Sequence, residues 1–340
     1  MSPAEAERLT IPAPAGFADD EEYPIRELPD VPIWSENFWF VAYDPGNRLG
    51  VWTHCGRSSW DPTVWRETVM VYLPDGDFLI TKGFGRHQTE SGPRASSLHF
   101  EMIEPWNRGA TRFDGAVIRV SRDQADGGAV GEGVHFGLRM DLDWRGLGPL
   151  WAMGQTDTED QTWGNTRYEQ FCAVTGTVEF EDQRLDFEGT ALRDHTRGAR
   201  DLTPLSRHSC FNCVFPESGR AFHALLVDID GSEPMRRAAV LEDGELVEAE
   251  ISHDTSLLES REQGDDPFEL GLAWPGGSAT IEAELVGNFP LAWGGFNEFV
   301  MGFDPEASYA VMFEGFSKYR WDGEEGYGLT ERSLRHRPGP

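Results

Sequence analysis

Residues Ala173 to Gly189 read Ala-Val-Thr-Gly-Thr-Val-Glu-Phe-Glu-Asp-Gln-Arg-Leu-Asp-Phe-Glu-Gly, a run in which polar and apolar side chains alternate. Because the side chains of a β-strand point alternately to opposite faces, this pattern is typical of a half-buried strand or hairpin. Other short apolar runs, at 67–72, 77–82, 116–120 and 221–228, are separated by turn sequences rich in Gly, Pro and Asp. The sequence therefore predicts a predominantly β chain.

The alternating run continues into Gly-Thr-Ala-Leu-Arg-Asp-His-Thr-Arg-Gly-Ala-Arg-Asp, residues Gly189 to Asp201, where ionisable side chains are unusually dense. We expect these side chains at a sheet edge or at the mouth of a cavity. They are Arg193, Asp194, His195, Arg197, Arg200 and Asp201.

Two interpretations of this segment compete. In one, the arginines and aspartates form a buried ion-pair lattice, since such networks shift pKa values without any catalysis. In the other, Asp194 and His195 form a proton-transfer pair, because an imidazole beside a carboxylate can exchange protons near neutral pH. The sequence leaves both open.

Composition narrows the class of partner. The chain has 340 residues, and its 59 acidic and 29 basic residues give a formal net charge of −30. This charge repels phosphate backbones and anionic lipid surfaces, so we expect no nucleic-acid partner. No stretch approaches the roughly 20 apolar residues that cross a bilayer. We expect a soluble, cytoplasmic protein, whose oligomeric state the sequence leaves unknown.

The length predicts about two domains. Residues 1–30, rich in Pro, Ala and Glu, predict a mobile N-terminal arm and do not resemble a secretory signal. We place a first β domain at 31–189 and a second at 190–340.

The four cysteines give no disulfide framework, and the Cys210-Phe-Asn-Cys213 pair lies in an alternating run that favours two strand cysteines over a zinc or redox motif. The histidines lack the spacing of a metal site, and no glycine loop suits a nucleotide. We therefore expect neither metal nor cofactor. The twelve tryptophans, among them Trp39, predict either ordinary core packing or an aromatic wall around an apolar ligand.

The Gly189–Asp201 segment, Phe313-Glu314-Gly315 and the run Asp322-Gly323-Glu-Glu-Gly326-Tyr327-Gly328-Leu-Thr-Glu331-Arg332-Ser333 together resemble a bacterial family related to the carotenoid 1,2-hydratases. That wider group includes AttH-like and kievitone hydratase-like proteins, and the resemblance extends from about Trp34 to Arg335. Arg197 departs from the pattern, in which an aromatic residue, usually Trp, is expected. The resemblance implies two consecutive lipocalin-like β-barrels and an apolar ligand, isoprenoid or steroid-like, held in or between the barrels.

On such a frame the residues could add water to an alkene or remove it, or isomerise or cyclise the substrate, by acid–base chemistry alone. The alternative is a lipocalin-like carrier that binds an apolar small molecule and does no chemistry. The candidate catalytic residues are His195, Asp194, Glu314 and Tyr327. The candidate substrate-binding residues are Glu169, Arg193, Arg200, Asp201, Trp39 and Glu331.

Overall fold

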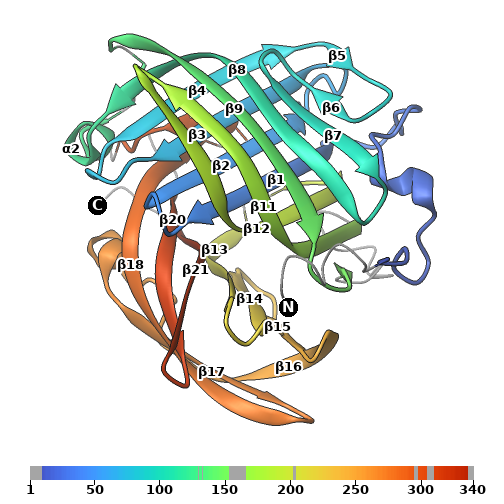
Figure 1. Ribbon diagram of the computed structural model, residues 1–340, viewed down its shortest axis with the longest axis vertical. Coiled ribbons are helices and arrows are strands. Elements are labelled where there is room, and N and C mark those ends of the chain that lie inside the picture. Colours follow the sequence, from blue (N-terminus) through green and yellow to red (C-terminus); the bar gives the residue numbers. More distant parts are fainter. Residues whose placement is uncertain are drawn as a thin grey trace. The chain divides into compact units, whose positions relative to one another are not determined.

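The computed structural model describes residues 10–128, 130–131, 133–152, 166–201, 204–294, 298–304 and 310–335. The chain divides into two compact units. The first unit comprises Ser2–Val120 and Glu132–Asp201, and the second comprises Ser121–Gly131 and Leu202–Pro340, with Met1. Both units are built almost entirely from antiparallel strands (Figure 1), as the sequence predicts.

The first unit is a closed antiparallel barrel, formed by 8 strands among the described residues. Each strand pairs with the next, and the last pairs with the first. The strands, in order around the barrel, are β1 (Trp34–Asp44), β2 (Leu49–Arg57), β3 (Trp65–Tyr72), β4 (Phe78–Gly85), β8 (Arg108–Val120), β9 (His135–Gly146), β11 (Thr166–Phe180) and β12 (Gln183–Ala199). Shorter elements are η1 (Asp19–Glu22), β5 (His87–Gln88), β6 (Pro93–Arg94), β7 (Leu98–Glu104) and β10 (Trp151–Ala152).

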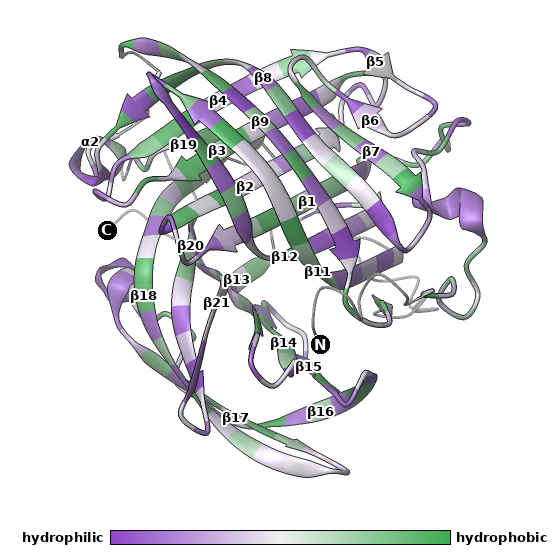
Figure 2. Cartoon of the chain, viewed as in Figure 1, coloured by the Kyte–Doolittle hydropathy of each residue, from purple (hydrophilic) through white to green (hydrophobic). Residues whose placement is uncertain are grey.

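The alternating run of the sequence forms the β11–β12 hairpin, in which Phe180 pairs with Gln183. Its apolar residues, including Val174, Val178 and Phe187, point into the barrel core with residues of β1 and β9. Figure 2 shows the resulting bands of hydrophilic and hydrophobic residues along these strands. The strand passes close to β1 at Gly189, where a Cβ would lie 2.0 Å from the carbonyl oxygen of Tyr43.

The strands of the second unit also close on themselves, because β17 pairs with both β16 and β18. Around this ring lie β13 (Leu205–Val214), β14 (Ala221–Ile229), β15 (Met235–Glu242), β16 (Glu245–Asp254), β17 (Phe268–Trp274), β18 (Gly277–Gly294), β20 (Ala310–Trp321) and β21 (Glu324–Arg335). The remaining elements are β19 (Glu298–Met301), η2 (Arg261–Asp265) and α2 (Arg122–Asp126), a short helix that precedes β9 in the chain. Helix α2 belongs to this unit because Phe303 donates its amide to Ala125 O (2.9 Å) and Arg122 binds Asn288.

Two expected boundaries differ from the structure. The division predicted between residues 189 and 190 falls inside β12, whose whole length pairs with β1 and β11, and the units divide after Asp201 instead. The arm predicted over residues 1–30 is described from residue 10 on, and there it packs onto the first unit. Ile11 joins an apolar cluster with Trp106 and Tyr168. None of the helices in the described part of the chain has the length and apolar character needed to span a bilayer.

Candidate functional site

The proton-transfer pair predicted from Asp194 and His195 does not form. The two residues are neighbours on β12, and successive side chains of a strand point to opposite faces. His195 faces the barrel interior, between Phe38 of β1 and Tyr168 of β11. Asp194 faces outward, beside Trp39 and Glu169 in the same register.

Inside the barrel, His195 bridges a phenol and a carboxylate. Its Nδ1 lies 2.8 Å from Tyr168 Oη, and its Nε2 lies 3.1 Å from Glu36 Oε1. An ionised carboxylate can only accept hydrogen bonds, so Nε2 carries the proton of the neutral ring and Tyr168 donates to Nδ1. Glu36 also accepts from Arg57 Nε (3.1 Å) and from the amide of Ile25 (3.1 Å).

Burial sets the protonation of this network. Burial lowers the pKa of His195 despite the nearby Glu36, and it raises the pKa of Tyr168 well above its usual range. For Glu36, burial would raise the pKa, but hydrogen bonds from His195 and Arg57 and the charge of Arg57 outweigh it and lower the pKa. The network therefore holds a neutral imidazole between a protonated phenol and an ionised carboxylate.

Arg193 extends the network to the N-terminal segment. It forms a buried ion pair with Glu22, donates to Gln170 Oε1 (2.7 Å) and lies 4.6 Å over the Trp144 ring. Arg197, at the position where the related family has an aromatic residue, donates to the carbonyl of Glu21 (3.0 Å). One interpretation of the sequence pairs these arginines with aspartates of the same segment, but Arg193 and Arg197 bind Glu22 and Glu21 instead. This lattice holds the N-terminal segment against the barrel.

On the outer face of the first unit, the predicted residues Asp194 and Glu169 share one partner. Arg167 Nε lies 2.9 Å from Asp194 Oδ2, and Arg167 also binds Glu169. Thr196 Oγ1 donates to Asp194 (2.9 Å). Trp39 packs edge-on against Trp52, with ring centroids 6.1 Å apart.

The last two predicted residues of the charged segment lie at its end. Arg200 follows β12 and donates its amide to Ile33 O (3.1 Å), and Asp201 comes next. Both are partly exposed, unlike Arg193, Asp194 and His195 of β12.

The three predicted residues of the second unit share one sheet face. Glu314 and Glu331 are direct cross-strand neighbours on β20 and β21, and Tyr327 lies on the same face of β21. This face is opposite to the one that carries Tyr319 of the apolar core, because Tyr319 binds Thr330. Both carboxylates are nonetheless buried, with 1% of Glu314 and 8% of Glu331 exposed.

A histidine that the sequence analysis did not single out lies beside Glu331. His208 of β13 contacts the Glu331 carboxylate through Nε2, and its Nδ1 lies 2.7 Å from Ser333 Oγ. We call Ser333, His208 and Glu331 the His208 relay. A hydroxyl, an imidazole and a carboxylate in this order can move a proton along the chain of three groups.

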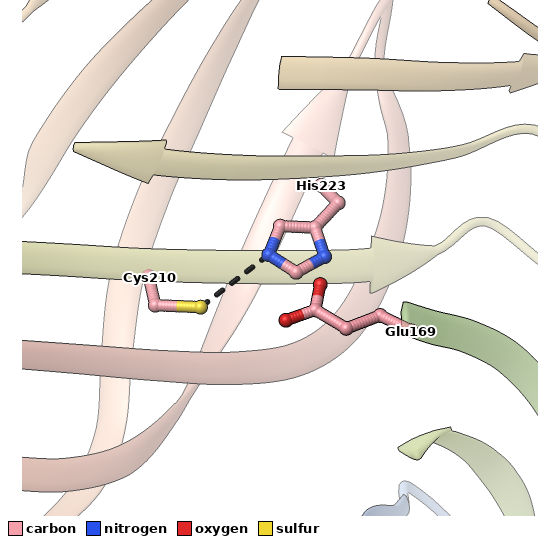
Figure 3. Close-up of side chains that lie close together, drawn as sticks. All are labelled: Glu169, Cys210 and His223. Carbon is pink, nitrogen blue, oxygen red and sulfur yellow. Dashed lines mark hydrogen bonds between the residues drawn. The ribbon is translucent and has the colours of Figure 1, made fainter. Parts of the chain in front are cut away.

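The same face carries a second pair. Cys210 Sγ lies 3.4 Å from His223 Nε2 of β14 (Figure 3), and both residues are 1% exposed. Cys210 is the cross-strand neighbour of Glu331, so the pair adjoins the His208 relay. Thiol and imidazole are also ligand types that bind zinc.

Strand periodicity could have found these residues. His208, Cys210 and Asn212 recur at every second position, as do Glu331 and Ser333, so each set shares one face. The pairing of the two sets could not be read from the sequence. The strands β13 and β21 approach closely at Gly328, where a Cβ would lie 1.9 Å from Asn212 O.

A family model described as a domain of unknown function (DUF7064) matches residues 19–335. The chain belongs to this family. A search of curated proteins finds no match to the sequence.

Solved structures share the fold of this DUF7064 protein. A protein described as AttH from Nitrosomonas europaea is 13% identical, with a TM-score of 0.62, and the match covers 96% of this chain and 99% of that one. Kievitone hydratase from Nectria haematococca is 13% identical, with a TM-score of 0.55 and 88% of each chain covered. The protein CghA is 10% identical, with a TM-score of 0.53, covering 91% of this chain and 90% of the other. These matches confirm the predicted fold of the AttH and carotenoid 1,2-hydratase group.

Proposed function

We propose that this DUF7064 protein is an enzyme that adds or removes water, or moves a double bond, in an apolar alkene-bearing small molecule of isoprenoid or steroid-like type. The observation that carries the proposal is the position of His208 between Ser333 and Glu331 on a buried sheet face. The fold shared with a protein named kievitone hydratase supports the same class of reaction.

The His208 relay supplies the base. An ionised Glu331 can only accept a hydrogen bond, so it holds the ring proton on Nε2 and leaves the lone pair of Nδ1 facing Ser333 Oγ. When Ser333 gives its proton to Nδ1, the imidazolium that forms is stabilised by the Glu331 carboxylate. Ser333 is then the group that exchanges a proton with the substrate.

The cross-strand neighbour Glu314 supplies the acid. In the dehydration direction, Ser333 Oγ takes a proton from the carbon beside the hydroxyl-bearing carbon while its own proton passes to His208. The C–H electron pair forms the double bond, the C–O bond breaks, and the carboxyl group of Glu314 protonates the leaving hydroxyl to give water. Return of the proton from His208 to Glu314 completes the cycle, and the reverse sequence is a hydration. Tyr327, on the same face, is proposed to orient the water.

The proposal is tested by incubating the protein with pools of isoprenoids, steroids and aromatic polyketides and searching by mass spectrometry for the gain or loss of one water. The substitution His208→Gln should lower the rate of conversion by about 10²- to 10⁴-fold, the usual contribution of a positioned acid–base group.

The matched control is His253→Gln, because His253 is an exposed histidine 3.6 Å from Glu269. It should convert substrate at the wild-type rate. Full activity in His208→Gln would contradict the proposed relay. Bound ligand recovered unchanged from the wild-type protein would favour the carrier instead.

A further inference from the structure

The CxxC pair of β13 divides between two environments. Cys210 and Cys213 are three residues apart on one strand, so their side chains point to opposite faces. Cys213 lies in the apolar core of the second unit with Phe211 and Phe222. Burial raises the pKa of the Cys213 thiol well above its usual range, and its Sγ contacts only a carbonyl oxygen, that of Val214 (3.5 Å), among the hydrogen bonds described. Cys213 is therefore an inert core cysteine.

Cys210 has a different partner. Its Sγ lies 3.4 Å from Nε2 of His223, on the neighbouring strand β14 (Figure 3). In the tautomer that carries the ring proton on Nδ1, Nε2 can accept the thiol proton. A thiol within hydrogen-bond reach of an imidazole is the arrangement that activates a cysteine nucleophile. The cross-strand neighbours of Cys210 are Leu225 on one side and Glu331 on the other.

We propose that Cys210 and His223 form a nucleophile–base pair that adds the thiol to an apolar alkene conjugated to a carbonyl group. The thiol proton passes to His223 Nε2 as Cys210 Sγ forms a bond to the β-carbon of the alkene. The π electron pair moves to the α-carbon and carbonyl as an enolate, and the α-carbon then takes the proton from His223. Atoms and charge balance without any oxidant or metal, and the reverse sequence releases the alkene.

The surroundings of Cys210 select this class of electrophile. The thiol is 1% exposed and its neighbour Leu225 is 3% exposed, so a charged reagent would lose its hydration on reaching the sulfur. A neutral, apolar alkene loses little on the same transfer. This step goes beyond the proposed hydration chemistry and uses neither Ser333 nor His208, so the two proposals can fail independently.

The experiment compares the two cysteines within one folded protein. N-ethylmaleimide, a neutral alkene conjugated to carbonyl groups, is added to the native protein with EDTA present, and peptide mass spectrometry follows alkylation at each cysteine over time. Cys210 should react at least about tenfold faster than Cys213, since a nearby base increases the thiolate population. Iodoacetate, an anionic reagent, should show a much smaller preference for Cys210.

Two variants connect the rate to His223. His223→Gln should slow alkylation of Cys210 by about tenfold while leaving Cys213 unchanged. His253→Gln, which replaces an exposed histidine outside both sites, should change neither rate. Equal alkylation of Cys210 and Cys213 in the wild-type protein would overturn the proposal. This comparison uses the wild-type protein alone, so it does not depend on whether a variant folds. A Cys210 rate unaffected by His223→Gln in a protein with wild-type circular dichroism would also overturn it.

Discussion

The polar network inside the first barrel and the His208 relay of the second unit both contain a buried histidine beside a glutamate, but the two histidines have different surroundings. Around His195, Glu36 also binds Arg57 and the backbone of Ile25. His208 contacts two side chains, Glu331 and Ser333. The first network holds the N-terminal segment against the barrel through Ile25, whereas the second joins two neighbouring strands, β13 and β21, and is the site proposed for proton transfer. Neither density of charge in the sequence nor the type of partner distinguishes the two cases, since each imidazole lies between a hydroxyl and a carboxylate. The two networks differ in the parts of the chain that they connect.

The largest expected effect tests the structural role of the first network. Arg193→Met keeps the length and apolar stem of the side chain but leaves Glu22 buried without its partner. Removing one member of a buried ion pair costs about 3–5 kcal/mol, so the free energy of unfolding should fall by that amount. Urea denaturation followed by tryptophan fluorescence measures the change.

The matched control for Arg193→Met is Arg139→Met, which removes an exposed arginine 3.0 Å from Asp141. Exposed pairs contribute little to stability, so the urea midpoint should stay at the wild-type value. If both variants lost the same small amount, the lattice around Arg193 would not hold the N-terminal segment in place, and the contrast between the two units would fail.

The second effect concerns the His208 relay. Glu331→Gln retains an oxygen that can accept from His208 Nε2, so the free energy of unfolding should change little. It removes the negative charge that stabilises the imidazolium, which is worth about 1.5–3 kcal/mol and should lower the rate by about 10- to 100-fold. The measurement is the rate of substrate conversion beside a urea titration. A large loss of stability with unchanged turnover would make the relay a structural pair like that of Glu36.

The sequence predicted much of the fold, because a period of two in side-chain polarity and the Gly, Pro and Asp turns are local signals. The β11–β12 hairpin is the clearest case. It also predicted that Cys210 and Cys213 are strand cysteines, which the structure confirms. The predicted pairing of Asp194 with His195 was wrong. The two residues are adjacent in the sequence, but in a strand adjacent side chains point to opposite faces of the sheet.

The partners that decide the two networks lie far away in the sequence. Glu36 reaches His195 across 159 positions, and His208 reaches Ser333 across 125. Contacts at such separations depend on which strands become neighbours in the barrel, and no local pattern encodes that choice. The family resemblance drew attention to both Glu314 and Glu331, but only the register of β13 against β21 places His208 beside Glu331.

The smallest effect is a dependence of stability on pH that arises from His195. Burial lowers the pKa of His195 in the folded protein, so as the pH falls below 6.5 the unfolded chain takes up a proton before the folded chain does. Stability should therefore decrease from pH 6.5 down to the folded-state pKa. Glu36, whose pKa is lowered, contributes stability that is present above 4.5 and is lost only as the pH falls through its folded-state value. Glu36 therefore does not contribute to the change in stability between pH 4.5 and 6.5, but His54 and His99 do, because burial lowers the pKa of both.

The comparison of wild type with His195→Gln makes this pH effect specific. Over that window the wild type should lose stability relative to the variant, because the variant has no imidazole to titrate. Tyr168→Phe removes the hydroxyl that donates to Nδ1 and stabilises the neutral ring. The substitution should therefore raise the pKa of His195 and narrow the pH range over which stability is lost. Parallel urea midpoints for all three proteins from pH 6.5 to 4.5 would show that His195 is not held neutral by its surroundings. The role of the first network would then rest on the Arg193–Glu22 pair alone.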